Sequence, residues 1–152
     1  MLGLLITVVL VSQEPAAADS AIDRVLTSFH AAAAKADEKT YFGCLAGNSV
    51  FMGTDATERW TKEEFRKYCK PYFDQGRGWN YVKKERHITL APDGKTAWFD
   101  ELLENQKNGL CRGSGVLTKE GEHWLIAQYN LSIPIPNEAF AKIKPLIDAA
   151  KK

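Results

Sequence analysis

The second half of the chain alternates short extended segments with turn sequences at nearly regular intervals. Turn residues recur at 91–94, 105–109 and 119–121, and each of these groups contains glycine. Turns this short join neighbouring antiparallel strands. We therefore predict an antiparallel meander of four strands, at residues 79–90, 95–104, 110–118 and 122–131.

Helical patterns come before this meander. After Ser20, apolar residues fall at helical spacing along one face, at Ile22, Val25, Leu26, Phe29 and Ala33. A short helix at 38–45 and a short strand at 49–52 follow. Thr61 and Glu64 fit a capping box, which predicts a helix at 62–73, and Asn137 can begin a last helix after a proline-rich segment. Helices followed by a meander predict the α+β class, with helices packed on one face of a single sheet.

The first eighteen residues differ in composition from the rest. An apolar run from Leu2 to Val11 is followed by three alanines, Ala16 to Ala18, which is typical of a signal peptide, and the run is too short to span a bilayer. We expect residues 1–18 to be removed on export to the periplasm or the exterior, with no permanent membrane anchor. A start placed too far upstream and an unstructured tail are the alternatives. Residues 19–152 have the length of one domain.

Charge and cysteine content exclude several classes of function. Twenty basic residues stand against nineteen acidic ones and are scattered along the chain, which does not favour nucleic acid as a partner. Cys44, Cys69 and Cys111 are too far apart for a zinc or CxxC motif, so we expect no metal and no cofactor. One pair could form a disulfide, or all three could be buried as small apolar side chains.

An ordered set of motifs resembles a known family. The motifs are Phe51–Trp60, Glu64–Phe65, Ala97–Glu101, Arg112–Leu117 and Trp124–Leu131. Together they resemble the SnoaL-like branch of the nuclear transport factor 2-like superfamily, over nearly everything after residue 18. The resemblance implies a cone in which a curved sheet wraps around helices and an internal pocket, and often a homodimer. Members include cyclases, isomerases and dehydratases, so the resemblance implies a pocket more than any reaction.

Strand register predicts which residues share a sheet face. A five-residue loop at 105–109 places Asp100 opposite Ser114 and Leu102 opposite Arg112. A three-residue loop ending at Gly121 places Thr118 opposite Glu122 and puts Gln128 and Asn130 on the face of Trp124. We predict that one face lines the pocket and carries the candidate ligand-binding residues Trp98, Asp100, Arg112, Ser114, Gln128 and Asn130.

The predicted polar group has two interpretations. Asp100 could act as a catalytic base or acid and Arg112 could bind an anionic group, or the two could form a structural ion pair. Trp60, just before the third helix, is a further candidate for the pocket wall. Asp55 and Glu58 could line the pocket mouth, or they could serve the turn and the solvent.

Two functions remain open. The chain could be an exported protein that binds a small hydrophobic or weakly polar molecule, or it could be an isomerase, dehydratase or cyclase that uses a pocket carboxylate. We also expect a homodimer through the outer face of the sheet. Four side chains are predicted to be partly exposed there, namely Phe99, Leu125, Ala127 and Tyr129.

Overall fold

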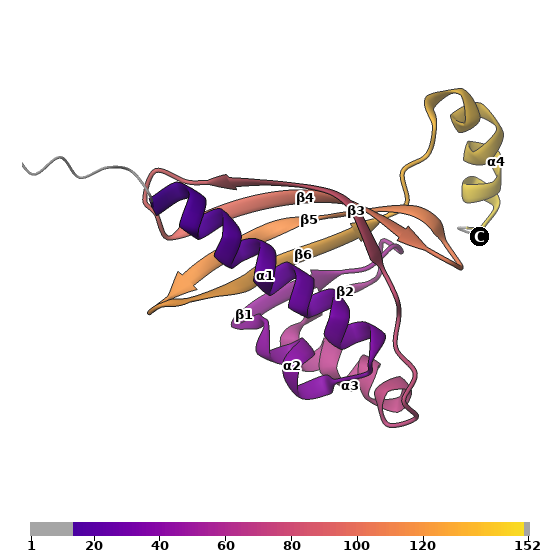
Figure 1. The fold of residues 1–152 in the computed structure, drawn as a ribbon. Coiled ribbons are helices and arrows are strands. Elements are labelled where there is room, and N and C mark those ends of the chain that lie inside the picture. The colour runs from indigo at the N-terminus through magenta and orange to yellow at the C-terminus, as the bar shows by residue number, and fades with distance from the viewer. Residues whose placement is uncertain (1–13, 151–152) are drawn as a thin grey trace, which may run out of the picture.

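The computed structural model describes residues 14–150 (Figure 1). The helices are α1 (Glu14–Ala34), α2 (Glu38–Gly43), α3 (Lys62–Phe73) and α4 (Phe140–Ala150), with a 3-10 turn η1 (Asn137–Ala139) before the last. The strands are β1 (Leu45–Met52), β2 (Arg59–Thr61), β3 (Val82–Leu90), β4 (Thr96–Asn105), β5 (Gly109–Glu120) and β6 (His123–Ser132). The predicted signal peptide, residues 1–18, lies largely outside the described part and stays a prediction.

The strands form one curved sheet in the order β2-β1-β6-β5-β4-β3. The predicted meander is its larger part, since β3 to β6 are antiparallel neighbours. The sequence did not reveal β2, nor that β1 begins at Leu45 and runs parallel to β6. Helix α1 lies along the inner face of the sheet, and α2 and α3 cover its β1 end (Figure 1). This arrangement confirms the predicted α+β cone.

The helices begin and end where local chemistry dictates. Helix α3 has the bounds predicted from the capping box: the Thr61 hydroxyl accepts from the Glu64 amide, and the Glu64 carboxylate accepts from the Thr61 amide at 2.8 Å. Helix α1 buries the apolar face that contains Ile22, Leu26 and Phe29 against the sheet. The last helix differs from the prediction, because Asn137 begins the 3-10 turn η1 and not α4.

Register between β4 and β5 is as predicted. Asp100 lies opposite Ser114, and Leu102 lies opposite Arg112. The turn is held by Asn105, whose side-chain oxygen accepts from the amides of Lys107 at 3.0 Å and Asn108 at 2.9 Å. An asparagine at this position closes the loop and so fixes the register of both strands.

Register between β5 and β6 differs from the prediction in two ways. The turn has two residues, so Thr118 lies opposite Leu125 and not Glu122, although Gly121 has the expected left-handed φ of 60°. A bulge then inserts Ala127, because Leu117 pairs with Ile126 while Val116 pairs with Gln128. The extra residue places Gln128 and Asn130 on the opposite face from Trp124 and Ile126.

The bulge determines which side chains of β6 face the helices. On its two sides, Trp124 and Ile126, then Tyr129 and Leu131, all point to the inner face and are buried. Phe99 and Tyr129 are only 3% and 2% exposed, so the prediction that they form an outer apolar patch is wrong. The homodimer itself stays a prediction.

All three cysteines are free and buried, as one of the two open alternatives predicted. Burial raises the pKa of the Cys69 thiol to about 12, and the pKa values of Cys44 and Cys111 are also raised by burial. Thiols in this state are poor nucleophiles. Among residues 14–150, no helix is long and apolar enough to cross a membrane.

The capping box of α3 gives a first testable prediction. Thr61→Ala removes the hydroxyl that accepts from the Glu64 amide, and should lower the free energy of unfolding by about 1 kcal/mol in urea denaturation. Thr61→Ser keeps a hydroxyl and should remain within a few tenths of a kcal/mol of the parent. Equal losses in the two variants would show that the cap does not stabilise α3.

Candidate functional site

A cavity of about 720 Å³ lies between the inner face of the sheet and the helices. Its inner wall consists of side chains from α1, α2, α3, β1 and β6. Its rim comes from the β1–β2 loop, the segment before β3 and the β4–β5 turn, and includes Glu58, Asn80, Gln106 and Lys107. The volume suits one small organic molecule.

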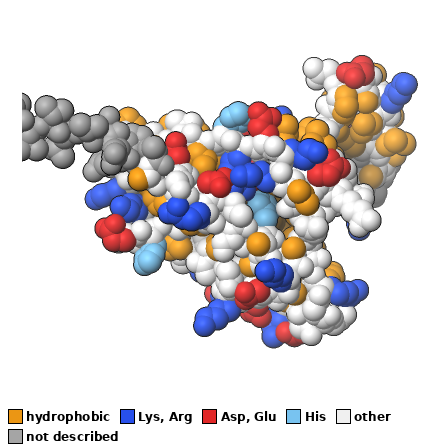
Figure 2. All heavy atoms as spheres, viewed as in Figure 1, with side chains coloured by type: hydrophobic (Ala, Val, Ile, Leu, Met, Phe, Trp, Pro, Cys, Tyr) orange, Lys and Arg blue, Asp and Glu red, His pale blue; other side chains and the backbone are white. Residues whose placement is uncertain are grey.

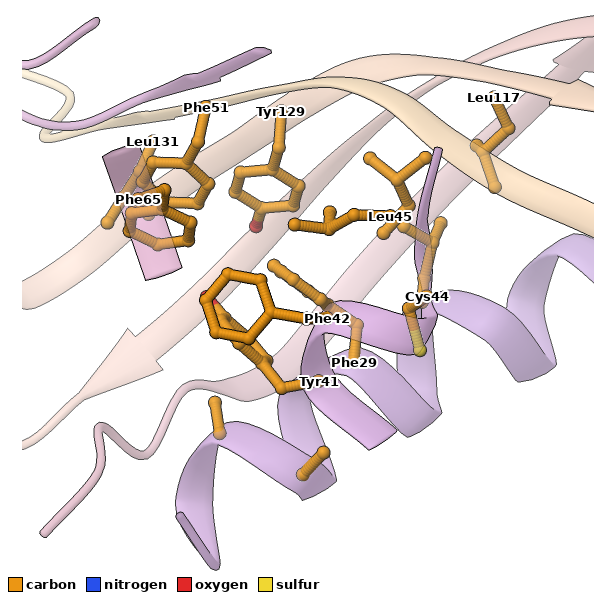
Figure 3. Close-up of a cluster of buried hydrophobic side chains, with 14 of the residues drawn as sticks. Phe29, Tyr41, Phe42, Cys44, Leu45, Phe51, Phe65, Leu117, Tyr129 and Leu131 are labelled. Atoms are coloured by element: carbon orange, nitrogen blue, oxygen red, sulfur yellow. The ribbon is translucent and has the colours of Figure 1, made fainter. Parts of the chain in front are cut away.

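Aromatic rings from separate elements form one wall of this cavity. Phe65 on α3 stacks on Phe51 of β1 at 3.9 Å between ring centroids, and Tyr129 of β6 lies parallel to Phe51 at 5.5 Å. Figure 3 shows these three rings side by side. Trp60 and Tyr68 extend the stack towards the solvent, with 4.7 Å between their centroids. These rings form an apolar wall along the cavity.

A buried carboxylate lies beside this wall. The Glu101 side chain on β4 has no solvent exposure, and its Oε1 accepts hydrogen bonds from Tyr129 Oη at 2.8 Å and from His30 Nε2 at 2.7 Å. Its Oε2 accepts from Arg86 Nε at 2.8 Å. Arg86 Nη2 makes an ion-pair contact with the same oxygen at 2.6 Å but lacks hydrogen-bond geometry. Both carboxylate oxygens are therefore satisfied.

Arg86 links this carboxylate to the first helix. Its side chain is 2% exposed, and Nη1 donates to the Asp23 carboxylate at 2.7 Å and to the Thr27 hydroxyl at 3.1 Å. Asp23 also pairs with Lys83 at the surface. The resulting chain of contacts ties α1 to β3, β4 and β6, and its buried arginine is flanked by two carboxylates.

The environment sets the protonation states of this cluster. Burial works to raise the pKa of Glu101, but the hydrogen bond from His30 and the charges of His30 and Arg86 outweigh burial and lower that pKa below its ordinary value. Burial, and then the Glu101 charge, raise the pKa of Tyr129 well above its ordinary value. Glu101 is therefore an ionised acceptor at neutral pH, and Tyr129 is a neutral donor.

The ionised carboxylate determines which nitrogen of His30 carries a proton. Since Glu101 can only accept, His30 Nε2 donates, which in a neutral ring leaves the lone pair on Nδ1. Among residues 14–150, Nδ1 has no hydrogen-bond partner and is not one of the buried unpartnered atoms. His30 lines the cavity. The ring therefore lies at the cavity wall, with its Nε2 held by the carboxylate behind it.

Most of the site residues predicted from the sequence lie on the other face of the sheet. Trp98, Asp100, Arg112, Ser114, Gln128 and Asn130 do share one face, but it is the outer one, and none of them lines the cavity. Trp98 is 49% exposed and Asp100 is exposed. The prediction that this face lines the pocket is therefore wrong, because register fixes which residues share a face and not which face the helices cover.

The predicted ion pair has a counterpart one residue away. Among the described residues no ion pair joins Asp100 to Arg112. Glu101, the next residue along β4, makes the buried pair with Arg86 instead. Trp60 and Glu58 do line the cavity, as the sequence suggested, whereas Asp55 bonds the amide of Thr57 within its own turn.

The sequence signal for the real cluster was present but weak. His30 lies one residue after Phe29 on the buried side of α1, and Glu101 occupies an inward position between Phe99 and Leu103. A charged residue among buried neighbours needs a partner. The sequence around either residue does not identify its partner, since His30 and Glu101 are 71 residues apart.

The curved sheet around helices and an aromatic pocket defines a nuclear transport factor 2-like cone. A family model for the SnoaL-like domain matches residues 22–136. The chain therefore belongs to the SnoaL-like domain family. No curated protein sequence matches the chain.

Solved structures share the fold at low sequence identity. A dehydratase candidate of the nuclear transport factor 2-like family from Streptomyces avermitilis has a TM-score of 0.68 at 12% identity, over 80% of this chain and 99% of that one. A candidate scytalone dehydratase from Novosphingobium aromaticivorans has a TM-score of 0.68 at 9% identity, over 82% and 89%. A nuclear transport factor 2-like protein of unknown function from Pseudomonas putida has a TM-score of 0.66 at 16% identity, over 82% and 92%. Identities this low show a shared fold alone.

The buried carboxylate gives a prediction about pH. The folded-state pKa of Glu101 is lowered, so its contribution to stability is present above the unfolded-state value of 4.5 and is lost as the pH falls through the folded-state pKa. Glu101→Gln should lower the free energy of unfolding by about 3 to 5 kcal/mol at pH 7, because Arg86 loses its buried partner. Below pH 4.5 the difference from the parent should shrink.

Urea denaturation at pH 7 and at steps below pH 4.5 measures this effect. Glu104→Gln is the matched control, since Glu104 lies on the same strand but is exposed. It should stay within about 0.5 kcal/mol of the parent. If the difference in free energy of unfolding between the parent and Glu101→Gln did not change with pH, Glu101 would not be the ionised group with a lowered pKa.

Proposed function

We propose that this protein binds a small, planar, largely apolar molecule in the cavity. The observation that carries the proposal is the group of aromatic rings of Phe51, Phe65, Tyr129 and Trp60, which makes one cavity wall apolar. A planar apolar ligand gains contact with these rings, and an aromatic pair adds about 0.5 to 1.5 kcal/mol to area burial. Asn80, Gln106 and Lys107 at the rim suit a polar substituent on the outer end of the ligand.

The placement of apolar and polar side chains around the cavity favours a binding function. Apolar and aromatic side chains form the inner wall, and polar side chains gather at the rim, an arrangement that suits a small molecule with one apolar end. Each oxygen of Glu101 already accepts from protein donors, so this carboxylate holds the site together and does not contact a ligand.

Trp60 allows a direct test of binding. Isothermal titration calorimetry with 2-naphthol as the probe should give saturable binding to the parent. Trp60→Ala should weaken the Kd about tenfold, the equivalent of about 1.4 kcal/mol, because the probe loses its aromatic contact with the indole ring. Trp60→Phe keeps an aromatic ring at this position and should retain most of the affinity of the parent.

The control is Trp98→Ala, which removes the same side chain from the outer face of the sheet. It should leave the Kd within twofold of the parent value, and thermal melts should confirm that all variants are folded. Absence of saturable binding by the parent, or an equal loss in the two alanine variants, would contradict a pocket that binds planar molecules.

The orientation of His30 favours a second candidate function, proton abstraction from a bound carbonyl compound. This is the chemistry of a dehydratase or isomerase, and two solved structures with this fold are named as candidate dehydratases. Here His30 Nδ1 would accept the proton, and Glu101 would stabilise the positive charge that forms on the ring. Tyr129 donates to Glu101 and keeps that carboxylate in position.

Hydrogen exchange tests this chemistry without knowledge of the natural substrate. In D2O, the protein should accelerate exchange of the acidic C1 protons of 2-tetralone, followed by NMR. His30→Asn should reduce the catalysed rate by about 100-fold or more, since it removes the proton acceptor. His87→Asn, a change at an exposed position on β3, should catalyse the exchange at the same rate as the parent protein. A parent rate no faster than buffer would rule out His30 as a base towards such carbonyl compounds.

A further inference from the structure

Helix α4 stands apart from the body of the protein. Its one substantial packing partner among the described elements is the 3-10 turn η1 that precedes it. Figure 1 shows the helix beyond the end of the sheet, joined to β6 by an extended segment. That segment contains Pro134 and Pro136, which cannot donate backbone hydrogen bonds to the sheet. Helix α4 is therefore held out from the sheet by a stiff connection.

The apolar side chains of α4 are unusually exposed. Leu146 is 70% exposed, Phe140 53% and Ile147 39%, and none of the residues of this helix is buried. At 100° per residue, Phe140, Ile143, Leu146 and Ile147 fall within about one third of the helix circumference. Figure 2 shows apolar side chains gathered over this helix. The apolar face therefore lacks a partner within the described structure.

The lysines of this segment flank its apolar face. Lys142 and Lys144 lie on either side of the apolar arc, and Lys151 and Lys152 follow in the sequence. Lys144 also forms an exposed ion pair with Asp148 on the same helix. Between residues 137 and 152 only Glu138 and Asp148 are acidic, so the segment has a net positive charge. Long lysine side chains beside an apolar face can place their amines at lipid phosphates while the apolar groups enter the acyl region.

We propose that α4 binds the surface of an anionic lipid bilayer through its apolar face and its flanking lysines. The charge pattern favours this occupant over the alternatives. A second copy of α4 packed face to face would bring the flanking lysines of both copies together, which is unfavourable. The mouth of the cavity presents Lys107 on its rim and no group of carboxylates to receive Lys142 and Lys144.

Vesicle co-sedimentation of the full chain tests the proposal. At about 50 mM salt, the parent should sediment with vesicles of phosphatidylcholine and phosphatidylglycerol in about a three to one ratio. It should not sediment with phosphatidylcholine alone, and about 500 mM salt should release it, because screening weakens the lysine contacts. Binding of equal strength to both vesicle types, or none to either, would overturn the proposal.

Two glutamate substitutions on α4 distinguish a role of its apolar face from a role of charge alone. Leu146→Glu places a charge in the apolar face and should weaken binding to the anionic vesicles at least tenfold. Ala149→Glu adds the same charge outside the apolar arc and should reduce binding no more than threefold. Equal losses would mean that charge alone governs binding, which overturns a role for the apolar face.

Thermal melts of Leu146→Glu test the alternative that α4 packs on the domain and closes the cavity. Because α4 does not pack on the sheet, this variant should melt within 1 °C of the parent, and 2-naphthol should bind it with an unchanged Kd. A large fall in Tm together with altered probe binding would show that α4 closes the cavity, and would overturn the membrane proposal. Failure of vesicle binding alone leaves the pocket proposal intact, since the two rest on different residues.

Discussion

The buried carboxylate of Glu101 is the constraint on which the rest of the structure depends. A charge with no solvent exposure is stable only where charged and hydrogen-bonding groups replace its water. His30, Arg86 and Tyr129 supply these groups from α1, β3 and β6, so one anion ties the first helix to the sheet in addition to its apolar packing. The same contacts orient the His30 ring towards the cavity. Stability and the candidate chemistry of the site therefore share one set of interactions.

This constraint extends to the backbone around it. Gly113 on β5 lies opposite Glu101 in the sheet, and a Cβ at this position would overlap the Tyr129 hydroxyl and approach the Glu101 carboxylate to 2.8 Å. Glycine is therefore required where the cluster crosses β5. The bulge at Ala127 has a related effect, because without the extra residue Tyr129 would point away from Glu101. A glycine and a bulge, both unremarkable in sequence, make the polar cluster possible.

The sequence predicted the local features of this protein well and its inner surface poorly. Capping fixed helix α3 to the residue, and the Asn105 turn fixed the β4–β5 register, because both depend on groups within a few residues. The inner face was misassigned because Trp98, Asp100 and Leu102 alternate as plausibly as Phe99, Glu101 and Leu103. Only the position of α1 decides between them, and that depends on contacts more than 60 residues apart in the chain. The bulge had no sequence signal that would have revealed it.

The family relationship accounts for some of these features and not for others. The matched stretch, residues 22–136, contains the cavity, His30 and the Glu101 cluster, and ends where η1 begins. Helix α4 lies beyond it, so its exposed apolar face is a property of this chain that the family domain does not explain. Since folds of this kind support unrelated activities, the pocket chemistry must be argued from the orientation of His30, and the role of α4 from its own charge and exposure. The proposed ligand site and the proposed lipid-binding helix therefore share no residues.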